Sequence, residues 1–345
     1  METPSADSDS HPDLDLDPGR DFDVVIVGGG AAGLSAALVL GRARRRVAVI
    51  DAGSPRNAPA AHMQGYLSRD GMPPAELLAA GRAEVAGYGV EVIDGVVDRI
   101  DRIDQIDRID RIDPGFTVHL GRGPELTARR LLVATGVGDE LPDVPGVRER
   151  WGRDLLHCPY CHGWEVRDQP LGVLGSNPGA VLHAQLVRQW SDDVVYFAHT
   201  QEPTGAEAAE LDARGIRVVP GEVARLVVED DRLTGVELAG GRIVPRSAVF
   251  VRPVNVPHPD GLLAKLGCDL DEAGFPVVDR TGRTTTPGVW AAGNAADPRA
   301  QVVTAAGAGS AAAIAVNADL TQADITLALE TRPGTFSQRR PRGSP

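Results

Sequence analysis

The chain has 345 residues, 42% hydrophobic and 24% charged, so it is long enough to form two globular domains of ordinary size. Its net charge is −13, and residues 24–331 alone carry −10, which argues against binding to a nucleic-acid phosphate backbone. Aromatic residues make up only 4% of the chain, so few side chains are available to stack on the bases of single-stranded nucleic acid.

Both ends of the chain have the composition of solvated tails. Residues 1–20 are rich in Asp, Ser and Pro, and residues 332–345 carry four arginines, so neither stretch can bury enough apolar surface to order itself. The N-terminus has no basic region followed by an apolar run, so we expect no secretory signal, no membrane span and a cytoplasmic address. Three cysteines make no structural disulfide framework.

Short apolar runs alternate with helical patterns, which predicts parallel sheets with crossover helices. The expected strands are residues 24–27, 47–51, 131–134, 171–174 and 194–198. The expected helices are residues 31–44, 74–86, 179–190, 206–214 and about 301–320.

The first strand runs directly into residues 28–33, Gly-Gly-Gly-Ala-Ala-Gly, which fit GxGxxG between a strand and a helix. The glycines allow a tight turn, the approach of a pyrophosphate to the helix N-terminus and close helix packing. The next strand ends at Asp51, where a carboxylate can accept the ribose hydroxyls. A glycine-rich turn without a ligand is the alternative, and this context makes it the weaker one.

Residues 98–112 repeat Asp-Arg-Ile, with one Asp-Gln-Ile in the middle. An apolar residue at every third position gives a continuous apolar face to neither a helix nor a strand. We interpret the repeat as an expanded connection before a strand at residues 115–120. A partner-binding helix is the alternative.

Cys158 and Cys161 stand in the sequence Cys-Pro-Tyr-Cys-His-Gly-Trp-Glu, preceded by His157 and followed by His162. Two sulfurs at this spacing can close a small disulfide ring and reopen it, and the histidines can stabilise a thiolate or take up its proton. Half of a zinc site is the alternative, but zinc needs four ligands and the remaining cysteine is Cys268. The segment therefore predicts a redox element and no metal site.

A second strand-to-helix junction, residues 172–180, is a degraded nucleotide loop. Ser176 and Asn177 stand where a close backbone approach would require glycine. The following strand ends in residues 199–202, His-Thr-Gln-Glu, which supply no arginine for a 2′-phosphate, and Glu202 would repel one. We therefore leave NAD(P)H binding doubtful: a Rossmann-like domain that lost its nucleotide fits at least as well as a working NADPH site.

Together with the small-residue turns at residues 133–136 and 288–294, these motifs resemble the low-molecular-weight thioredoxin reductase family of FAD-dependent pyridine nucleotide-disulfide oxidoreductases, over about residues 21–320. The resemblance implies an α/β fold of two Rossmann-like, three-layer ββα dinucleotide-binding domains, with the second inserted into the first. The implied FAD domain comprises residues 21–150 and 252–325, with the repeat insertion at 98–113. The implied inserted domain, residues 151–251, is NAD(P)-binding-like and carries the CxxC.

The chain also departs from the family pattern. His162 stands where the family has Asp, Asn294 replaces the late Asp, and Ala300 replaces the Arg of an Arg-Gln pair. With the loop at residues 56–59, the CxxC segment is similar to a subgroup, the thioredoxin-reductase-like dithiol oxidases of the gliotoxin and holomycin kind. Those enzymes pass electrons from a substrate dithiol through CxxC and FAD to oxygen and release hydrogen peroxide.

By the resemblance, Cys158 faces the substrate, Cys161 lies against the flavin, and His162 and His157 handle protons. We also expect His62 near the flavin, Trp164 packed at the domain interface and Cys268 buried as a small hydrophobe. The residues expected to hold FAD are Gly28, Gly30, Ala31, Ala32, Gly33, Asp51, Ala52, Arg56, Asn57, Thr135, Gly136, Gly293, Asn294, Gln301 and Val302.

The function predicted from the sequence is therefore oxidation of a small-molecule dithiol, with FAD as cofactor and O2 as acceptor, by a homodimer as is usual in the family. One alternative is an NAD(P)H-dependent reductase of thioredoxin or of a small disulfide, in which electrons run backwards through the same groups. Another is a flavin redox sensor without turnover, whose CxxC state controls partner binding.

Overall fold

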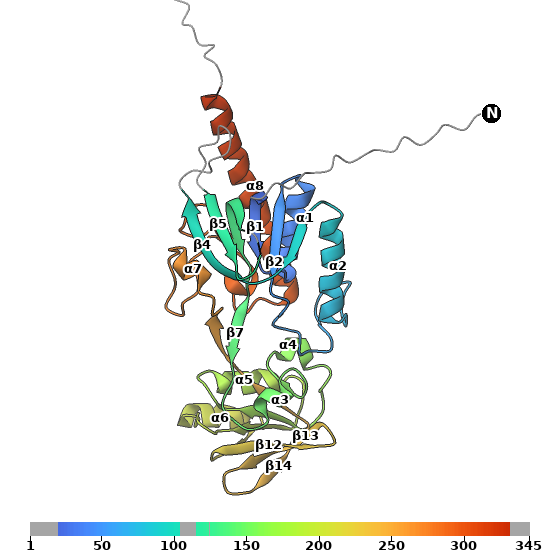
Figure 1. The fold of residues 1–345 in the computed structure, drawn as a ribbon. Helices are drawn as coiled ribbons and strands as arrows, with labels where there is room; N and C mark the ends of the chain where they lie inside the picture. The colour runs from blue at the N-terminus through green and yellow to red at the C-terminus, as the bar shows by residue number, and fades with distance from the viewer. Residues whose placement is uncertain (1–19, 104–114, 124, 332–345) are drawn as a thin grey trace, which may run out of the picture.

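The computed structural model describes residues 20–103, 115–123 and 125–331. Figure 1 shows two bodies, one above the other, joined by the antiparallel strands β7 (Val137–Glu140) and β16 (Val254–Pro257). The chain enters the second body after β7 and returns to the first through β16. The predicted α/β fold, with one Rossmann-like domain inserted into another, is confirmed.

The first body is built on a seven-stranded sheet. Its order is β3-β2-β1-β6-β5-β4, with β17 paired to β6, and the pairs β1–β2 and β1–β6 are parallel. The strands are β1 (Arg20–Val27), β2 (Val47–Asp51), β3 (Glu91–Asp94), β4 (Val97–Ile103), β5 (Gly115–Leu120), β6 (Leu126–Val133) and β17 (Val289–Ala291). The helices are α1 (Ala31–Arg42), α2 (Pro74–Ala86), α7 (Leu262–Lys265) and α8 (Val302–Glu330).

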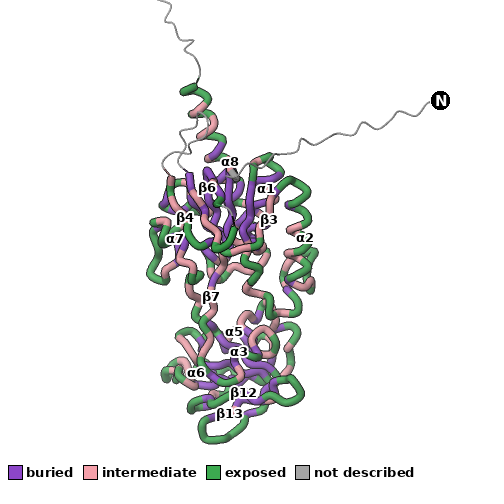
Figure 2. Tube along the Cα trace, viewed as in Figure 1, coloured by how far each residue is buried: buried purple, intermediate pink, exposed green. Residues whose placement is uncertain are grey.

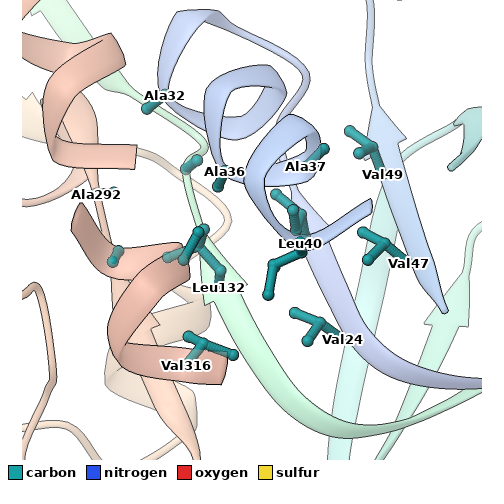
Figure 3. Packing of buried hydrophobic residues seen from close by; sticks show 14 of the residues in the cluster. Val24, Ala32, Ala36, Ala37, Leu40, Val47, Val49, Leu132, Ala292 and Val316 are labelled. Atoms are coloured by element: carbon teal, nitrogen blue, oxygen red, sulfur yellow. The ribbon is translucent and has the colours of Figure 1, made fainter. Parts of the chain in front are cut away.

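The core of this body lies between the sheet and helices α1 and α8. Val24 of β1 and Leu132 of β6 are fully buried beneath Leu40 of α1, and Val316 of α8 completes the contact (Figure 3). The helices can approach closely because their facing residues are small: a methyl group added at Gly309 of α8 would collide with the backbone of α1. This packing brings the start of α8 next to the β1–α1 turn.

The second body carries a five-stranded parallel sheet, ordered β11-β10-β9-β15-β8, and a three-stranded antiparallel sheet, ordered β12-β13-β14. Figure 2 shows the buried segments of both bodies gathered along their strands. The strands are β8 (Leu155–Leu156), β9 (Leu171–Leu174), β10 (Val194–Phe197), β11 (Arg217–Val219), β12 (Val223–Glu229), β13 (Arg232–Leu238), β14 (Ile243–Pro245) and β15 (Ala248–Val251). The helices are α3 (Val147–Arg150), α4 (Pro159–His162), α5 (Ala180–Val187) and α6 (Gly205–Ala213).

The repeat at residues 98–112 is not only a connection. Its first six residues belong to β4, which pairs antiparallel with β5 at the edge of the sheet, so that part of the interpretation is wrong. An edge strand needs only one protein partner, so a mixed face is tolerated, and Ile100 packs against the core. Residues 104–112 lie outside the described residues.

Several elements differ from their predicted bounds. Strand β6 begins at Leu126 instead of residue 131, and helix α5 ends at Val187 instead of residue 190. β1 begins at Arg20, inside the predicted tail, and α8 continues to Glu330 instead of ending near residue 320. Residues 1–19 and 332–345 of the predicted tails are outside the described residues. By length and composition, α8 is the one described helix that could cross a membrane, yet its Val316 and Leu320 are fully buried in the core of the first body.

Candidate active site

The two cysteines of the CxxC form a disulfide at the start of α4. Cys158 caps this helix, and Pro159 occupies the first helical position, where a missing backbone N–H costs nothing. The backbone N–H groups of Cys161 and His162 both donate to the Cys158 carbonyl at 3.1 Å. Gly163 caps the C-terminus of the helix, and a side chain at this position would collide with the Pro159 carbonyl and the Trp190 ring. The local sequence thus holds the two sulfurs in bonding position.

The disulfide lines a cavity of about 620 Å³ whose walls come from both bodies. The first body contributes the β1–α1 turn, the loop after β2 and the start of α8. The second body contributes Trp151, Gly152, Leu156, His157 and the CxxC. A cavity of this size and composition is typical of a cofactor or ligand site.

The β1–α1 turn forms a bare cradle at one wall of this cavity. A methyl group at Gly28, which has φ +107°, would strike the Ala134 carbonyl, and one at Gly33 would strike the Gly28 carbonyl. At Gly30, which caps α1, an added methyl would meet nothing within 4 Å. The glycines therefore fit the FAD pyrophosphate, which needs close backbone approach at a helix N-terminus.

Every residue predicted to hold the cofactor lines the cavity except Gly33, which lies behind the turn and sets its packing. All four predicted catalytic residues line it as well. The residues brought together are Gly28, Gly30, Ala31, Ala32, Asp51, Ala52, Arg56, Asn57, Thr135, Gly136, His157, Cys158, Cys161, His162, Gly293, Asn294, Gln301 and Val302.

Two of the predicted cofactor residues are held by ion pairs. The Asp51 carboxylate, at the end of β2, bonds to Arg82 of α2, which also donates to Asp94 at 2.9 Å. The Arg56 guanidinium donates to both carboxylate oxygens of Asp139 on β7, at 2.7 and 2.6 Å. The loop after β2 is thereby tied to the strand that leads to the second body.

The start of α8 faces the disulfide. The Nε2 atom of Gln301, the residue that caps α8, lies 4.0 Å from the Cys158 sulfur and 3.9 Å from the Cys161 sulfur. The Asn294 amide donates to the carbonyls of Asp297 at 3.0 Å and Ala300 at 2.9 Å. Asn294 therefore shapes the loop that delivers Gln301 to the sulfurs.

Burial lowers the pKa of both histidines beside the CxxC and so favours the neutral imidazole. Burial, with a smaller contribution from the Arg56 charge, lowers the pKa of His157, whose Nδ1 lies 3.4 Å from the Val251 carbonyl. Burial also lowers the pKa of His162, although Glu165 partly opposes the shift. A neutral imidazole can accept a proton, so either ring can serve as a base next to the disulfide.

The sequence reasoning missed a second pair on the cavity wall, His258 and Asp260. The His258 Nδ1 atom lies 2.8 Å from an Asp260 carboxylate oxygen, and this hydrogen bond raises the pKa of His258. Nothing in the local pattern marked these residues, because they follow β16 and reach the cavity only through the return of the chain to the first body. The weak candidate His62 also lines the cavity, with its Nδ1 atom 3.0 Å from the Gly71 carbonyl.

Two expectations outside the cavity had opposite outcomes. Trp164 is 66% exposed, with the Arg167 guanidinium 4.0 Å above its ring, so the prediction that it packs at the domain interface is wrong. Its position just past the short α4 turns it towards solvent, and Gly152 packs against Pro59 between the bodies instead. Cys268 is confirmed as a buried free cysteine, with its sulfur 3.4 Å from the Thr284 hydroxyl.

A family model for pyridine nucleotide-disulphide oxidoreductases matches residues 22–327, and the chain belongs to this family. Thioredoxin reductases of this family are FAD-binding flavoproteins, so the chain is an FAD-dependent enzyme that exchanges electrons with disulfides.

The relatives place the chain more narrowly. It is 31% identical to the thioredoxin reductase sirT of Leptosphaeria maculans over 319 residues, which are 88% of this chain and 96% of that protein. A probable thioredoxin reductase of Arthroderma benhamiae is 34% identical over 188 residues, 54% of this chain but only 46% of that protein. The crystal structure of HlmI superposes with a TM-score of 0.85 at 60% identity, covering 90% of this chain and 96% of that one. The resemblance to the thioredoxin-reductase-like dithiol oxidase subgroup is confirmed.

Proposed function

We propose that this protein oxidises a small-molecule dithiol to an intramolecular disulfide, with the Cys158–Cys161 disulfide as the immediate oxidant and O2 as the final acceptor. The family supplies the FAD and the thiol–disulfide chemistry. We infer the direction of electron flow from one observation: side chains fill the turn between β9 and α5, where a nucleotide would need bare backbone.

In this turn the Arg252 guanidinium lies across Gly179, the residue that caps α5, so that a methyl group on Gly179 would collide with Arg252 Nη1. The Asn177 amide donates to the Arg252 carbonyl and holds that segment against the turn. A dinucleotide pyrophosphate needs bare backbone at this place, as Gly30 provides in the first body. The side chains that fill this turn therefore favour a reaction in which the electrons come from a substrate other than NADPH.

The end of β10 supports the same direction. The His199 Nδ1 atom accepts a hydrogen bond of 3.1 Å from the Val223 backbone N–H, so this side chain is committed to β12. Residues 199–202 contain no guanidinium for a 2′-phosphate, and the Glu202 carboxylate would repel one.

The residues permit a balanced exchange. One substrate thiolate attacks the Cys158 sulfur, the Cys158–Cys161 bond breaks, and Cys161 leaves as a thiolate. The second substrate thiol then attacks the substrate sulfur of the mixed disulfide, which releases the cyclic disulfide product and a reduced Cys158. His157 and His162 take up the two substrate protons. FAD, when bound, would accept two electrons from the reduced cysteine pair, and O2 would take up these two electrons and the two protons to give hydrogen peroxide.

The decisive experiment uses the FAD-loaded protein without oxygen. We expect a dithiol such as dithiothreitol to bleach the flavin band and NADPH to leave it unchanged; admission of air should restore the band and produce one peroxide per flavin. Bleaching by NADPH but not by the dithiol would establish the reductase instead. If neither compound reduced the flavin, the result would favour the alternative function, a flavin redox sensor without turnover.

We also propose that the protein is a homodimer, as is usual in its family. Light scattering of the FAD-loaded protein should give twice the chain mass of 36.3 kDa. A monomer mass across the micromolar range would contradict the proposal.

A further inference from the structure

The residues His258 and Asp260 lie where two hollows of the molecule meet. One is the cavity that holds the redox disulfide, and the other is a small hollow of about 40 Å³ beside α7, which we call the α7 hollow. The two share Thr135, Gly136, His258 and Asp260 as walls. The remaining walls of the α7 hollow are mainly apolar and include Leu262 and Pro276. Because about 10–15 Å³ already holds one water molecule, a small uncharged molecule such as O2 has room beside His258.

Asp260 holds both His258 and the start of α7. One of its carboxylate oxygens lies 2.8 Å from the Nδ1 atom of His258, and the other accepts a hydrogen bond of 3.1 Å from the Leu262 backbone N–H. The imidazole is therefore fixed through one nitrogen. Its other nitrogen, Nε2, has no partner among the residues that the structure describes, and the side chain is 41% exposed. Nε2 is thus available to a molecule in the cavity.

His258 also differs in charge from the histidines beside the disulfide. The hydrogen bond to Asp260 raises the pKa of His258, although burial partly opposes the shift, whereas burial lowers the pKa of His157 and of His162. A larger share of His258 is therefore cationic at pH 7 than of an ordinary histidine. The other charged groups on the neighbouring elements are Asp139 and Glu140 of β7, Lys265 of α7 and Asp271 in the turn that follows α7.

This difference matches the two halves of the proposed reaction. Oxidation of a dithiol releases two protons beside the disulfide, where neutral imidazoles can accept them. Reduction of O2 to hydrogen peroxide takes up two protons and needs a donor. Groups whose environments push their pKa values apart mark the base and the acid of a reaction. Figure 1 shows α4, which carries Cys161, and α7, which follows His258, on opposite sides of β7.

We propose that His258 is the catalytic acid for the reduction of O2 and that Asp260 is the residue that positions it. The inference rests on the proposed function, because it takes O2 as the acceptor. In this step O2 accepts two electrons and one proton from the reduced cofactor and a second proton from Nε2 of the His258 imidazolium, which gives hydrogen peroxide. The neutral imidazole then regains a proton from solvent. A cation at this place also stabilises the negative charge that O2 gains with the first electron.

The test follows the reoxidation of the flavin by itself. The FAD-loaded protein is reduced photochemically without oxygen, so that no dithiol is needed, and is then mixed with O2 in a stopped-flow instrument. The rate constant of the wild type should fall as the pH rises through the folded-state pKa of His258, because the imidazolium is lost. His258→Gln should react about 100-fold more slowly at pH 7 and lose this pH dependence. Asp260→Asn, which keeps an acceptor for the Leu262 N–H, should move the inflection to lower pH.

The matched control is His119→Gln, because His119 lies 2.9 Å from the Asp101 carboxylate but outside the cavity. Its reoxidation rate should equal that of the wild type. NMR titration of the FAD-free proteins adds a readout that does not depend on catalysis. The pKa of His258 should lie above the ordinary value of about 6.5 in the wild type and should be lower in Asp260→Asn.

Equal reoxidation rates of wild type and His258→Gln across the pH range would overturn the proposal. If His258→Gln loses FAD, Asp260→Asn takes its place, and an unchanged inflection would overturn the proposal in the same way. Failure of the proposed function looks different: a dithiol would then not bleach the flavin, whereas reoxidation of the photoreduced protein would still depend on His258.

Discussion

Around the redox disulfide, individual side chains decide what the cysteines can do. His157 and His162 come from the same short segment as the cysteines, whereas Gln301 comes from the first body and reaches both sulfurs. Burial lowers the pKa of both imidazoles, which favours their neutral, proton-accepting form. The site combines a local redox element with one distant amide.

The roles of the two cysteines can be separated by substitution. Cys161→Ser should lower turnover by about 100-fold or more, because a serine can neither close nor reopen the disulfide. FAD should stay bound, because the glycine cradle that receives its pyrophosphate lies in the first body. Steady-state oxygen uptake and the flavin-to-protein ratio check the two outcomes. Cys268→Ser, a buried cysteine outside the cavity, should retain activity, and loss of FAD from Cys161→Ser would contradict this division of roles.

Buried histidines predict a stability that depends on pH. His183 has its pKa lowered to about 4 in the folded protein, against about 6.5 when unfolded. As the pH falls, His183 therefore takes up a proton in the unfolded chain before it does so in the folded protein. Its contribution to the unfolding free energy is fully present above pH 6.5 and is lost as the pH falls towards 4. At pH 5 this group should cost about 2 kcal/mol of unfolding free energy relative to pH 7.

Urea unfolding of the wild type and of His183→Phe at pH 7 and pH 5 checks this difference. The variant should lose less stability than the wild type between the two pH values, and His62→Gln should behave like the wild type. An equal loss in His183→Phe and the wild type would show that His183 does not carry the acid sensitivity.

In the β1–α1 turn, two glycines have different roles, one in packing and one in ligand binding. Gly33 serves packing, since a side chain there meets the Gly28 carbonyl, and Gly30 serves the ligand, since a side chain there points into open space. Gly33→Ala should lower the unfolding free energy by about 1–3 kcal/mol through overpacking. Gly30→Ala should fold normally but bind FAD more weakly, because its methyl group fills the cradle.

Equilibrium dialysis for FAD and urea midpoints for the FAD-free proteins separate the two effects. The prediction fails if Gly30→Ala loses stability as much as Gly33→Ala, or if Gly30→Ala binds FAD as tightly as the wild type.

Strand β4 shows where element prediction from sequence stops. The three-residue period of the repeat suits neither a helix nor a strand, yet backbone pairing with β5 makes a strand of its first six residues. Backbone hydrogen bonds between paired strands form whatever the side chains are. Pairing with a neighbouring strand can therefore override the side-chain pattern of the segment itself. By contrast, β2 and β9 have the predicted bounds because their apolar runs are buried throughout. Helix α2 also has the predicted bounds, although only Pro74 and Val85 of its residues are buried.

Across the whole molecule, polar contacts near the cavity tie the first body to the two strands that connect it to the second body. Arg56 of the first body holds Asp139 of β7, and Asn255 of β16 donates to the same carboxylate at 2.8 Å. Arg56 also donates to the Pro298 carbonyl at 3.1 Å. One carboxylate therefore joins both connecting strands to the loops of the flavin cavity.

Asp139→Asn should lower the unfolding free energy by about 1–3 kcal/mol, since it leaves the partly buried Arg56 without its charged partner. Asp94→Asn, which loses an ion pair with an 84% exposed carboxylate, should cost less than about 1 kcal/mol. Urea denaturation of the FAD-loaded variants gives both values. Equal losses would show that Asp139 contributes no more than a surface charge.

By itself, the sequence determined the parts of this protein that depend on neighbours along the chain. The GxGxxG turn, the alternating strands and helices and the redox CxxC follow from residues within a few positions of one another. Only the tertiary structure placed Gln301 against the sulfurs, brought the neighbouring His258 and Asp260 to the cavity wall and laid Arg252 across the second turn. Each of these placements brings together segments that are far apart in the sequence, so no local pattern could contain it.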